Sequence, residues 1–115
     1  MTVPRLLTLR LTTDRRAHIL DGDATGGGHR YGTGHPGKTE FPADWTDARI
    51  AAAIVSVARA PDHVPVRQNW NERWRVRGAC DGVEGVAIVE PGGTVWTAWP
   101  LEASPGVVKN KIEDT

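Results

Sequence analysis

Glycine and proline dominate residues 21–44, and this segment constrains the fold more than any other feature of the sequence. Because glycine favours turns and proline interrupts helices and sheets, we expect an ordered loop here rather than a periodic element. His18 lies just before the Asp21–Asp23 turn, and His29 follows Gly26–Gly28. Histidine exchanges protons near neutral pH, so this pair is a candidate general acid and general base.

Helices are predicted on both sides of this loop. Residues 46–60 form the clearer helix, because Thr46 can cap its start and Pro61 would end it. Apolar residues recur at helical spacing within it, at Ile50, Ile54 and Val57. A shorter helix, capped by Thr13 or Asp14, is predicted before the loop.

Residues 73–102 predict an antiparallel meander of strands. Apolar or small residues alternate there with arginines, at Trp74, Val76 and Gly78, and Asp81-Gly82 is a hairpin signal. Trp96 and Trp99 are three residues apart, so in an extended strand one should lie in the core and the other should be exposed. Helices followed by strands indicate an α+β domain.

The length of 115 residues suits one domain over residues 1–115, with a core at about 12–102 and a polar tail at 106–115. The formal net charge is zero, which argues against an indiscriminate, strongly basic nucleic-acid binder. Cys80 is the only cysteine, so the chain cannot form an internal disulfide. No apolar run reaches transmembrane length and no signal-peptide pattern is present, so we expect no membrane association.

One segment matches the sequence pattern of a nucleotide-binding motif but lacks its structural context. Gly32–Thr39 satisfies the P-loop pattern, but a P-loop needs a strand before it and a helix after it. Pro42 opposes a helix at that position, so we reject an ATPase or GTPase. The same glycines could still offer backbone N–H groups to one phosphate.

Two further interpretations stay open on the residues alone. The loop offers nitrogen and oxygen metal ligands, although no tightly spaced histidine pair accompanies them; these are His18, Asp21, Asp23, His29 and His35. The segment 67–77 interleaves arginines with tryptophans, as RNA-binding surfaces do, but it equally fits the solvated side of a strand.

Four short motifs in a fixed order resemble the bacterial EndoU-type ribonuclease toxin domain. They are His18-Ile19-Leu20, Gly26–His29, Gly32–Pro42 and Thr97–Pro100, and they extend over about residues 12–100. The resemblance implies a barnase/EndoU/RelE-like (BECR) fold, with N-terminal helices packed on a C-terminal antiparallel β-sheet. It also implies RNA cleavage to a 2′,3′-cyclic phosphate and a 5′-hydroxyl.

The resemblance further implies roles for particular residues. The catalytic positions would be His29 as general base, His18 as general acid, Lys38 against the phosphorane charge, and Thr97. The substrate-binding positions would be Trp99, which stacks on a base, and Gly28, Arg30 and Thr39. No residue is assigned to a metal, no cofactor is required, and manganese would act only as a stimulant.

Many members of this family are toxin domains that act in the cytoplasm of a target bacterium, cut tRNA and are neutralised by a cognate immunity protein. We expect the same here. Two alternatives remain: a non-catalytic RNA-binding or protein-interaction module on the same scaffold, and a metal-dependent hydrolase.

Overall fold

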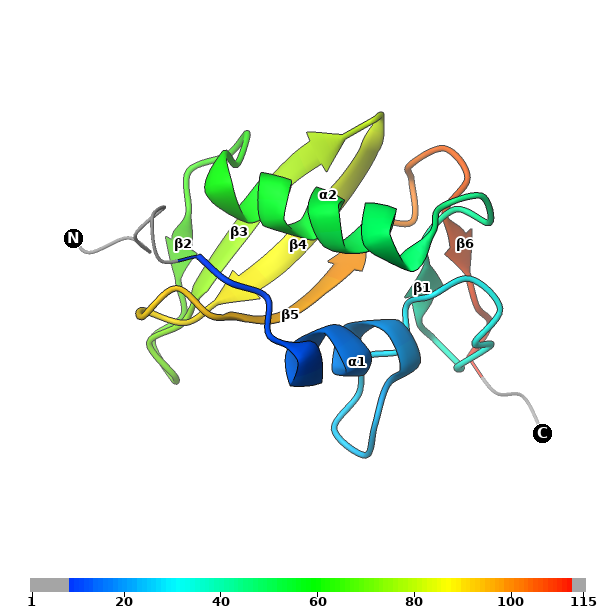
Figure 1. Cartoon of the computed structure of the whole chain (residues 1–115), viewed down its shortest axis with the longest axis horizontal. Coiled ribbons are helices and arrows are strands. Elements are labelled where there is room, and N and C mark those ends of the chain that lie inside the picture. The colour runs from blue at the N-terminus through cyan, green and yellow to red at the C-terminus, as the bar shows by residue number, and fades with distance from the viewer. Residues whose placement is uncertain (1–8, 113–115) are drawn as a thin grey trace.

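Two helices lie on one face of an antiparallel sheet in the computed structural model of the chain, which describes residues 9–112 (Figure 1). The elements in chain order are α1 (Thr13–Asp21), β1 (Thr39–Glu40), α2 (Asp47–Arg59), β2 (Val66–Arg67), β3 (Trp74–Cys80), β4 (Val83–Val89), β5 (Val95–Pro100) and β6 (Val108–Lys109). The main sheet has the order β2-β3-β4-β5, and β1 pairs with β6 in a second sheet. The predicted α+β class is confirmed.

The two helices differ in how well the sequence predicted their starts. Thr46 caps α2 as expected, and its hydroxyl accepts a hydrogen bond from the N–H of Arg49 at 3.1 Å. The predicted cap of α1 is wrong by one residue or more: Thr12, not Thr13 or Asp14, accepts from the N–H of Arg15. A cap must be extended and reach the N–H three residues on, and Thr12 meets both conditions.

The predicted meander and its hairpin are confirmed. Strand β3 alternates between buried and exposed residues, and it is joined to β4 by Asp81 and Gly82. Both turn residues have positive φ, which suits the right-handed twist of a two-residue hairpin. Among the residues described, neither helix is long and apolar enough to cross a membrane.

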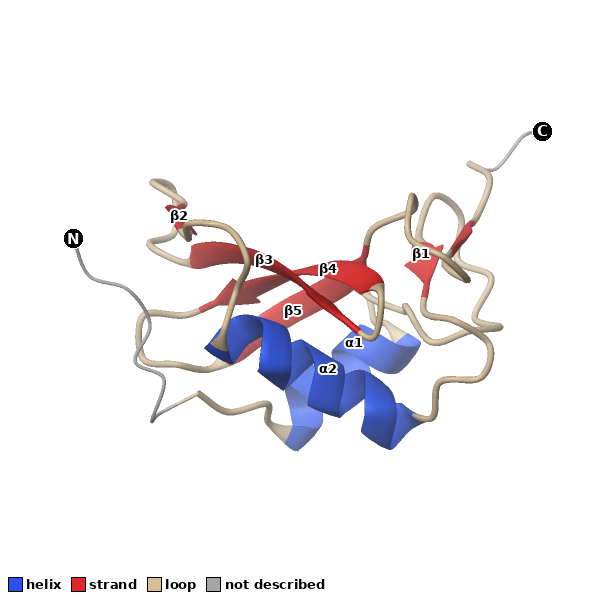
Figure 2. Ribbon diagram, turned by 90° about the horizontal axis from the view of Figure 1, so that it is seen from above, coloured by secondary structure: helices blue, strands red, loops and turns tan. Residues whose placement is uncertain are grey.

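The two faces of the main sheet have different surroundings. Val76, Ala87 and Ala98 are paired across β3, β4 and β5, and all three are buried in the core between the sheet and the helices. The neighbouring positions along each strand point to the opposite face. Figure 2 shows both helices below the sheet, and within residues 9–112 no helix lies on its upper face. We call this upper side the open face.

An irregularity in β5 corrects the prediction for the two tryptophans. Val95 pairs with Val89, but the next pair joins Thr97 to Ile88, so Trp96 is an extra residue in the strand. A bulge of this kind breaks the alternation of side chains. Trp96 and Trp99 are consequently both half-buried and both border the same cavity, rather than one in the core and one exposed.

The C-terminal segment is more than the predicted polar tail. Strand β6 pairs with β1, with Thr39 opposite Lys109 and Glu40 opposite Val108. This pairing satisfies backbone groups of β1 that would otherwise be unpaired, but a two-residue strand carries no readable periodicity. The end of the tail (113–115) and the start of the predicted domain (1–8) lie outside the described residues.

Candidate active site

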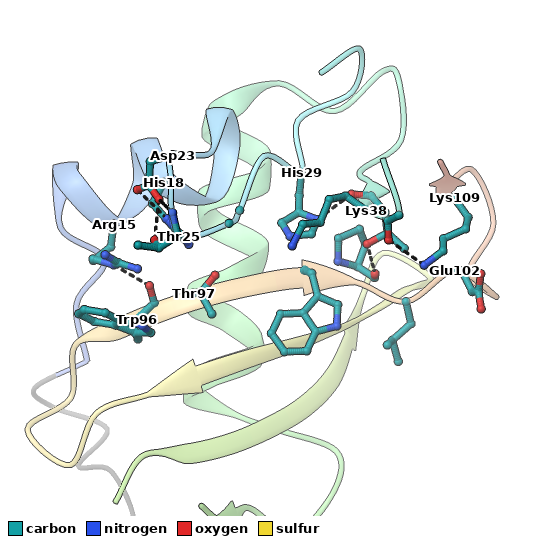
Figure 3. A pocket seen from close by; sticks show the side chains of 17 residues that line it. Arg15, His18, Asp23, Thr25, His29, Lys38, Trp96, Thr97, Glu102 and Lys109 are labelled. Carbon is teal, nitrogen blue, oxygen red and sulfur yellow. Dashed lines mark hydrogen bonds and ion pairs between the residues drawn. The ribbon is translucent and has the colours of Figure 1, made fainter. Parts of the chain in front are cut away.

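A cleft of about 730 Å³ lies between α1, the glycine-rich loop and β5 (Figure 3). Its lining includes most of the residues that the sequence singled out, namely His18, His29, Lys38, Thr39, Thr97 and Trp99. Figure 3 shows His18, His29 and Lys38 on one side, facing β5, which carries Thr97. The structure therefore brings together side chains that are up to 81 residues apart in the sequence.

Hydrogen bonds at the end of α1 explain why both histidines border the same cleft. The last carbonyl groups of a helix have no partner within it. Here the carbonyl of Ile19 accepts from the N–H of His29 at 2.7 Å, and that of His18 accepts from Gly28 at 3.1 Å. Gly27 must approach closely, since its φ is +79° and a Cβ there would overlap the carbonyl of His18. The loop therefore folds back against the end of α1, and this brings His29 to the cleft that His18 also borders.

His29 is held as a neutral imidazole. Its ring is buried, and its Nδ1–H donates to the backbone carbonyl of Thr39 at 2.6 Å. A carbonyl only accepts hydrogen bonds, so this contact assigns the proton to Nδ1 and leaves Nε2 with a free lone pair. Burial lowers the pKa of His29 from 6.5 to about 4, although the bond to Thr39 partly opposes it. At neutral pH, Nε2 can accept a proton.

His18 has a different partner. Its Nδ1 lies 2.8 Å from Oδ2 of Asp23, so the ring donates to a carboxylate. Hydrogen bonds from Thr25, and next from His18, hold the pKa of Asp23 well below its usual range. An anionic partner stabilises a protonated imidazole by a charge-assisted hydrogen bond. The Nδ1 of His18 is therefore bound to an anion, whereas that of His29 is bound to a neutral carbonyl.

Two lysines, Lys38 and Lys109, border the cleft. Lys38 reaches the loop between them, where a methyl group added to Gly26 would lie 3.5 Å from its ammonium. Its charge also contributes to the low pKa of His29. Lys109, which β6 brings to the rim, donates to the carbonyl of Gly37 at 2.9 Å. Lys38 is therefore the better-placed cation for a phosphate between the two rings.

Three predicted substrate-binding residues are occupied with holding the loop. The hydroxyl of Thr39 donates to the carbonyl of Pro100 at 2.7 Å, although Thr39 still borders the cleft. Arg30 and Gly28 lie outside the cleft lining. Arg30 binds Asp47 at 2.9 Å and also pairs with Asp21, which ties the loop to both helices.

The glycines of the P-loop look-alike already hold an anion of their own. The N–H groups of Gly32 and Gly34 donate to the carboxylate of Glu40 at 2.9 and 2.8 Å. Asn110 donates to the same carboxylate at 2.8 Å. Burial alone would raise the pKa of Glu40, but these bonds together lower it. The Glu40 carboxylate already occupies the backbone N–H groups that could have bound a phosphate, which supports the rejection of a nucleotide-binding P-loop.

Sequence reasoning missed the contact that joins α1 to β5. The Nε–H of Arg15 donates to the carbonyl of Trp96 at 2.6 Å, and its guanidinium lies 3.7 Å from the centroid of the indole. Arg15 precedes His18 by one helical turn, which was a readable signal that it shares the cleft face. Its partner is 81 residues away and was not readable.

The candidate metal ligands do not gather. Within residues 9–112 there is no group of three or more histidine, cysteine, aspartate or glutamate side chains that could hold an ion. His35, the third histidine among these candidates, donates from Nε2 to the carbonyl of Asp21 at 3.0 Å.

The fold and the cleft together define an α+β protein in which two histidines and two lysines border one cleft. The family model described as Bacterial EndoU nuclease matches residues 32–102, more than half of the chain, and the chain belongs to that family. The predicted resemblance is confirmed. A search of curated proteins and a search of solved structures each found no match.

Family membership supports endoribonuclease activity in general, with RNA as the substrate. The matched segment contains Lys38, Thr97 and Trp99, whereas both histidines precede it. The roles assigned to His18 and His29 therefore rest on the geometry of the cleft.

Proposed function

We propose that this protein cleaves RNA by acid–base transphosphorylation, with His29 as general base and His18 as general acid. The observation that carries the proposal is the contrast between their Nδ1 partners. Burial keeps His29 neutral and its bond to the Thr39 carbonyl leaves Nε2 free, while Nδ1 of His18 is bound to the Asp23 carboxylate. Both rings border one cleft.

The reaction follows from these states. Nε2 of His29 takes the proton of the ribose 2′-hydroxyl, and the oxygen attacks the adjacent phosphorus. The bond from phosphorus to the 5′-oxygen breaks, and His18 gives its proton to that leaving oxygen. The products are a 2′,3′-cyclic phosphate and a 5′-hydroxyl. The ammonium of Lys38 and the hydroxyl of Thr97 would stabilise the phosphorane charge, and Trp99 would stack on a base.

The biological setting remains a proposal supported by the resemblance. The chain would be a toxin domain that acts on tRNA in the cytoplasm of a target bacterium. A cognate immunity protein would cover the cleft. No cofactor would be required, and manganese would at most stimulate cleavage.

The first test is cleavage of total tRNA by the wild type and by His18→Ala and His29→Ala, with and without EDTA. Removing either proton-transfer group should lower the rate by about 10²–10⁴-fold. His63→Ala is the matched control, because His63 is exposed and does not border the cleft. Fragments should end in cyclic phosphate and persist in EDTA.

Three outcomes would contradict the proposal. Alanine variants that cut like the wild type would remove the histidines from the mechanism. Activity lost in EDTA would support the metal-dependent hydrolase. Tight binding of RNA that stays intact, with or without manganese, would support the binding module.

A further inference from the structure

Two arginines of strand β3, with a third directly before it, form a line on the open face of the main sheet. Arg73, Arg75 and Arg77 alternate with Trp74, Val76 and Gly78, which are buried on the helix side. Side chains in a strand alternate between faces, so all three arginines point away from α2. We call these three residues the arginine row.

The strand register connects the arginine row to the cleft. Arg75, Ile88 and Thr97 are paired across β3, β4 and β5, as are Arg77, Val86 and Trp99. Thr97 and Trp99 line the cleft, so the row occupies the same face two strands away, at about 10 Å. Figure 2 shows that no helix lies over this path.

The three arginines of the row differ in whether a carboxylate already lies near the guanidinium. Arg77 lies 3.2 Å from Glu84, and Arg73 lies 3.8 Å from Glu90. Arg75 is exposed and makes no ion pair or hydrogen bond within residues 9–112. Exposed pairs contribute little free energy, so an incoming phosphate can displace Glu84, but only Arg75 offers an uncommitted guanidinium.

Between the arginine row and the cleft, the surface is apolar rather than acidic. Val86 and Ile88 occupy the open face of β4 and are buried. An RNA strand crossing β4 would meet no carboxylate until it reached the ends of the strand at Glu84 and Glu90. Guanidinium groups bind phosphate oxygens in pairs, which suits them to a sugar–phosphate backbone.

We propose that Arg75, assisted by Arg77 and Arg73, binds backbone phosphates of the RNA segment that flanks the scissile bond. The substrate would then extend from the cleft across β4 to β3, and the protein would favour longer single-stranded RNA over a dinucleotide. This inference rests on the proposed function.

The test measures binding of a short single-stranded RNA oligonucleotide by the His29→Ala chain, alone and combined with Arg75→Gln. Removing one phosphate contact should weaken binding and reduce the slope of log K against log salt by about 0.7. Arg59→Gln is the matched control, since it removes the same charge from exposed Arg59 at the end of α2, beneath the sheet. Arg75→Lys should keep most of the salt slope.

Cleavage by the chain with its histidines intact separates the flanking site from the cleft. Arg75→Gln should lower kcat/KM for the oligonucleotide several-fold and leave that for a dinucleotide unchanged. Equal binding and salt slope in Arg75→Gln and the parent would overturn the inference, as would equal losses in Arg59→Gln or on the dinucleotide. If the wild type cleaves neither substrate while Arg75→Gln still weakens binding, the proposed function fails and the RNA-binding surface stands.

Discussion

His18 and His29 bring the same side chain into the same cleft, but the protein surrounds them differently. His29 is buried and donates to a carbonyl, whereas His18 donates to Asp23, a carboxylate whose side chain is 48% exposed. Burial keeps the ring of His29 neutral, whereas an anionic acceptor such as Asp23 stabilises a positively charged ring. The comparison teaches that two identical side chains can be prepared for opposite proton transfers by their surroundings, namely burial and the group that binds Nδ1.

The supports of the two rings also differ. Asp23 belongs to a tight turn in which its other carboxylate oxygen accepts from the N–H and hydroxyl of Thr25. The carbonyl of Thr39 belongs to β1, which is fixed by β6 and by the bond from Thr39 to Pro100. We therefore expect the His18 side to respond to local changes and the His29 side to respond to changes in the tertiary fold.

After the histidines themselves, the largest effect should come from Lys38, which borders the cleft together with both of them. Lys38→Ala should lower kcat/KM by about 10²–10³-fold, as expected for a group that stabilises transition-state charge. It should also move the acidic limb of the pH–rate profile to higher pH, because the charge of Lys38 helps to keep the pKa of His29 low.

The matched control is Lys109→Ala, which removes an exposed ammonium at the rim. It should change kcat/KM by no more than a few-fold. A larger loss in Lys109→Ala than in Lys38→Ala would transfer the phosphate-stabilising role to β6.

The burial of His29 predicts a pH dependence of stability. Its pKa is about 4 in the folded chain and 6.5 when unfolded, so the unfolded chain binds more protons between these values. The full contribution is present above pH 6.5 and is lost as the pH falls towards 4. At about 1.4 kcal/mol per pKa unit, the free energy of unfolding should fall by about 3 kcal/mol.

Urea unfolding of the wild type and of His29→Asn across this range measures the effect. Asparagine keeps a donor for the carbonyl of Thr39 but does not titrate. The variant should therefore lose this part of the pH dependence. An identical slope in both proteins would show that His29 is protonated as readily in the folded chain as in the unfolded one.

Asp23→Asn tests the other half of the comparison. Loss of a charge-assisted hydrogen bond of about 1.5–3 kcal/mol should lower kcat/KM by about 10- to 100-fold. The acidic limb of the pH–rate profile, which reports His29, should stay in place; a shift of that limb would reverse the two roles.

The smallest effect should come from Glu40, which holds the glycine loop on the His29 side. Glu40→Gln replaces one accepting oxygen by an NH₂ group that cannot take the bond from Gly32 or Gly34. The free energy of unfolding should fall by about 1–3 kcal/mol. Glu102→Gln, at an exposed carboxylate on the rim, should leave it unchanged. Equal stability of all three proteins would mean that the loop does not need this anion.

Much of the fold was readable because the signals are local. The cap at Thr46, the Asp81-Gly82 hairpin and the alternation along β3 depend on residues a few positions apart, and each is confirmed. The same reasoning misplaced the cap of α1, because Thr12, Thr13 and Asp14 are all capping residues in a row and only the backbone angles select among them.

The candidate site was only partly readable. The motifs drew attention to the histidines, Lys38, Thr97 and Trp99, and all of them border the cleft. Arg30 was also singled out, but it forms ion pairs with carboxylates from both helices and lies away from the cleft.

By itself, the sequence determined the class of fold, the glycine-rich loop after His18 and the family, because these depend on periodicity, turn chemistry and short ordered motifs. Only the tertiary structure decided the hydrogen-bond partner of each histidine, the bulge at Trp96, the burial of Glu40 and the register that pairs Arg75 and Thr97 with Ile88. The physical reason is that each of these depends on a hydrogen bond or a strand register between distant segments. No local pattern records which carbonyl or carboxylate such a segment will meet.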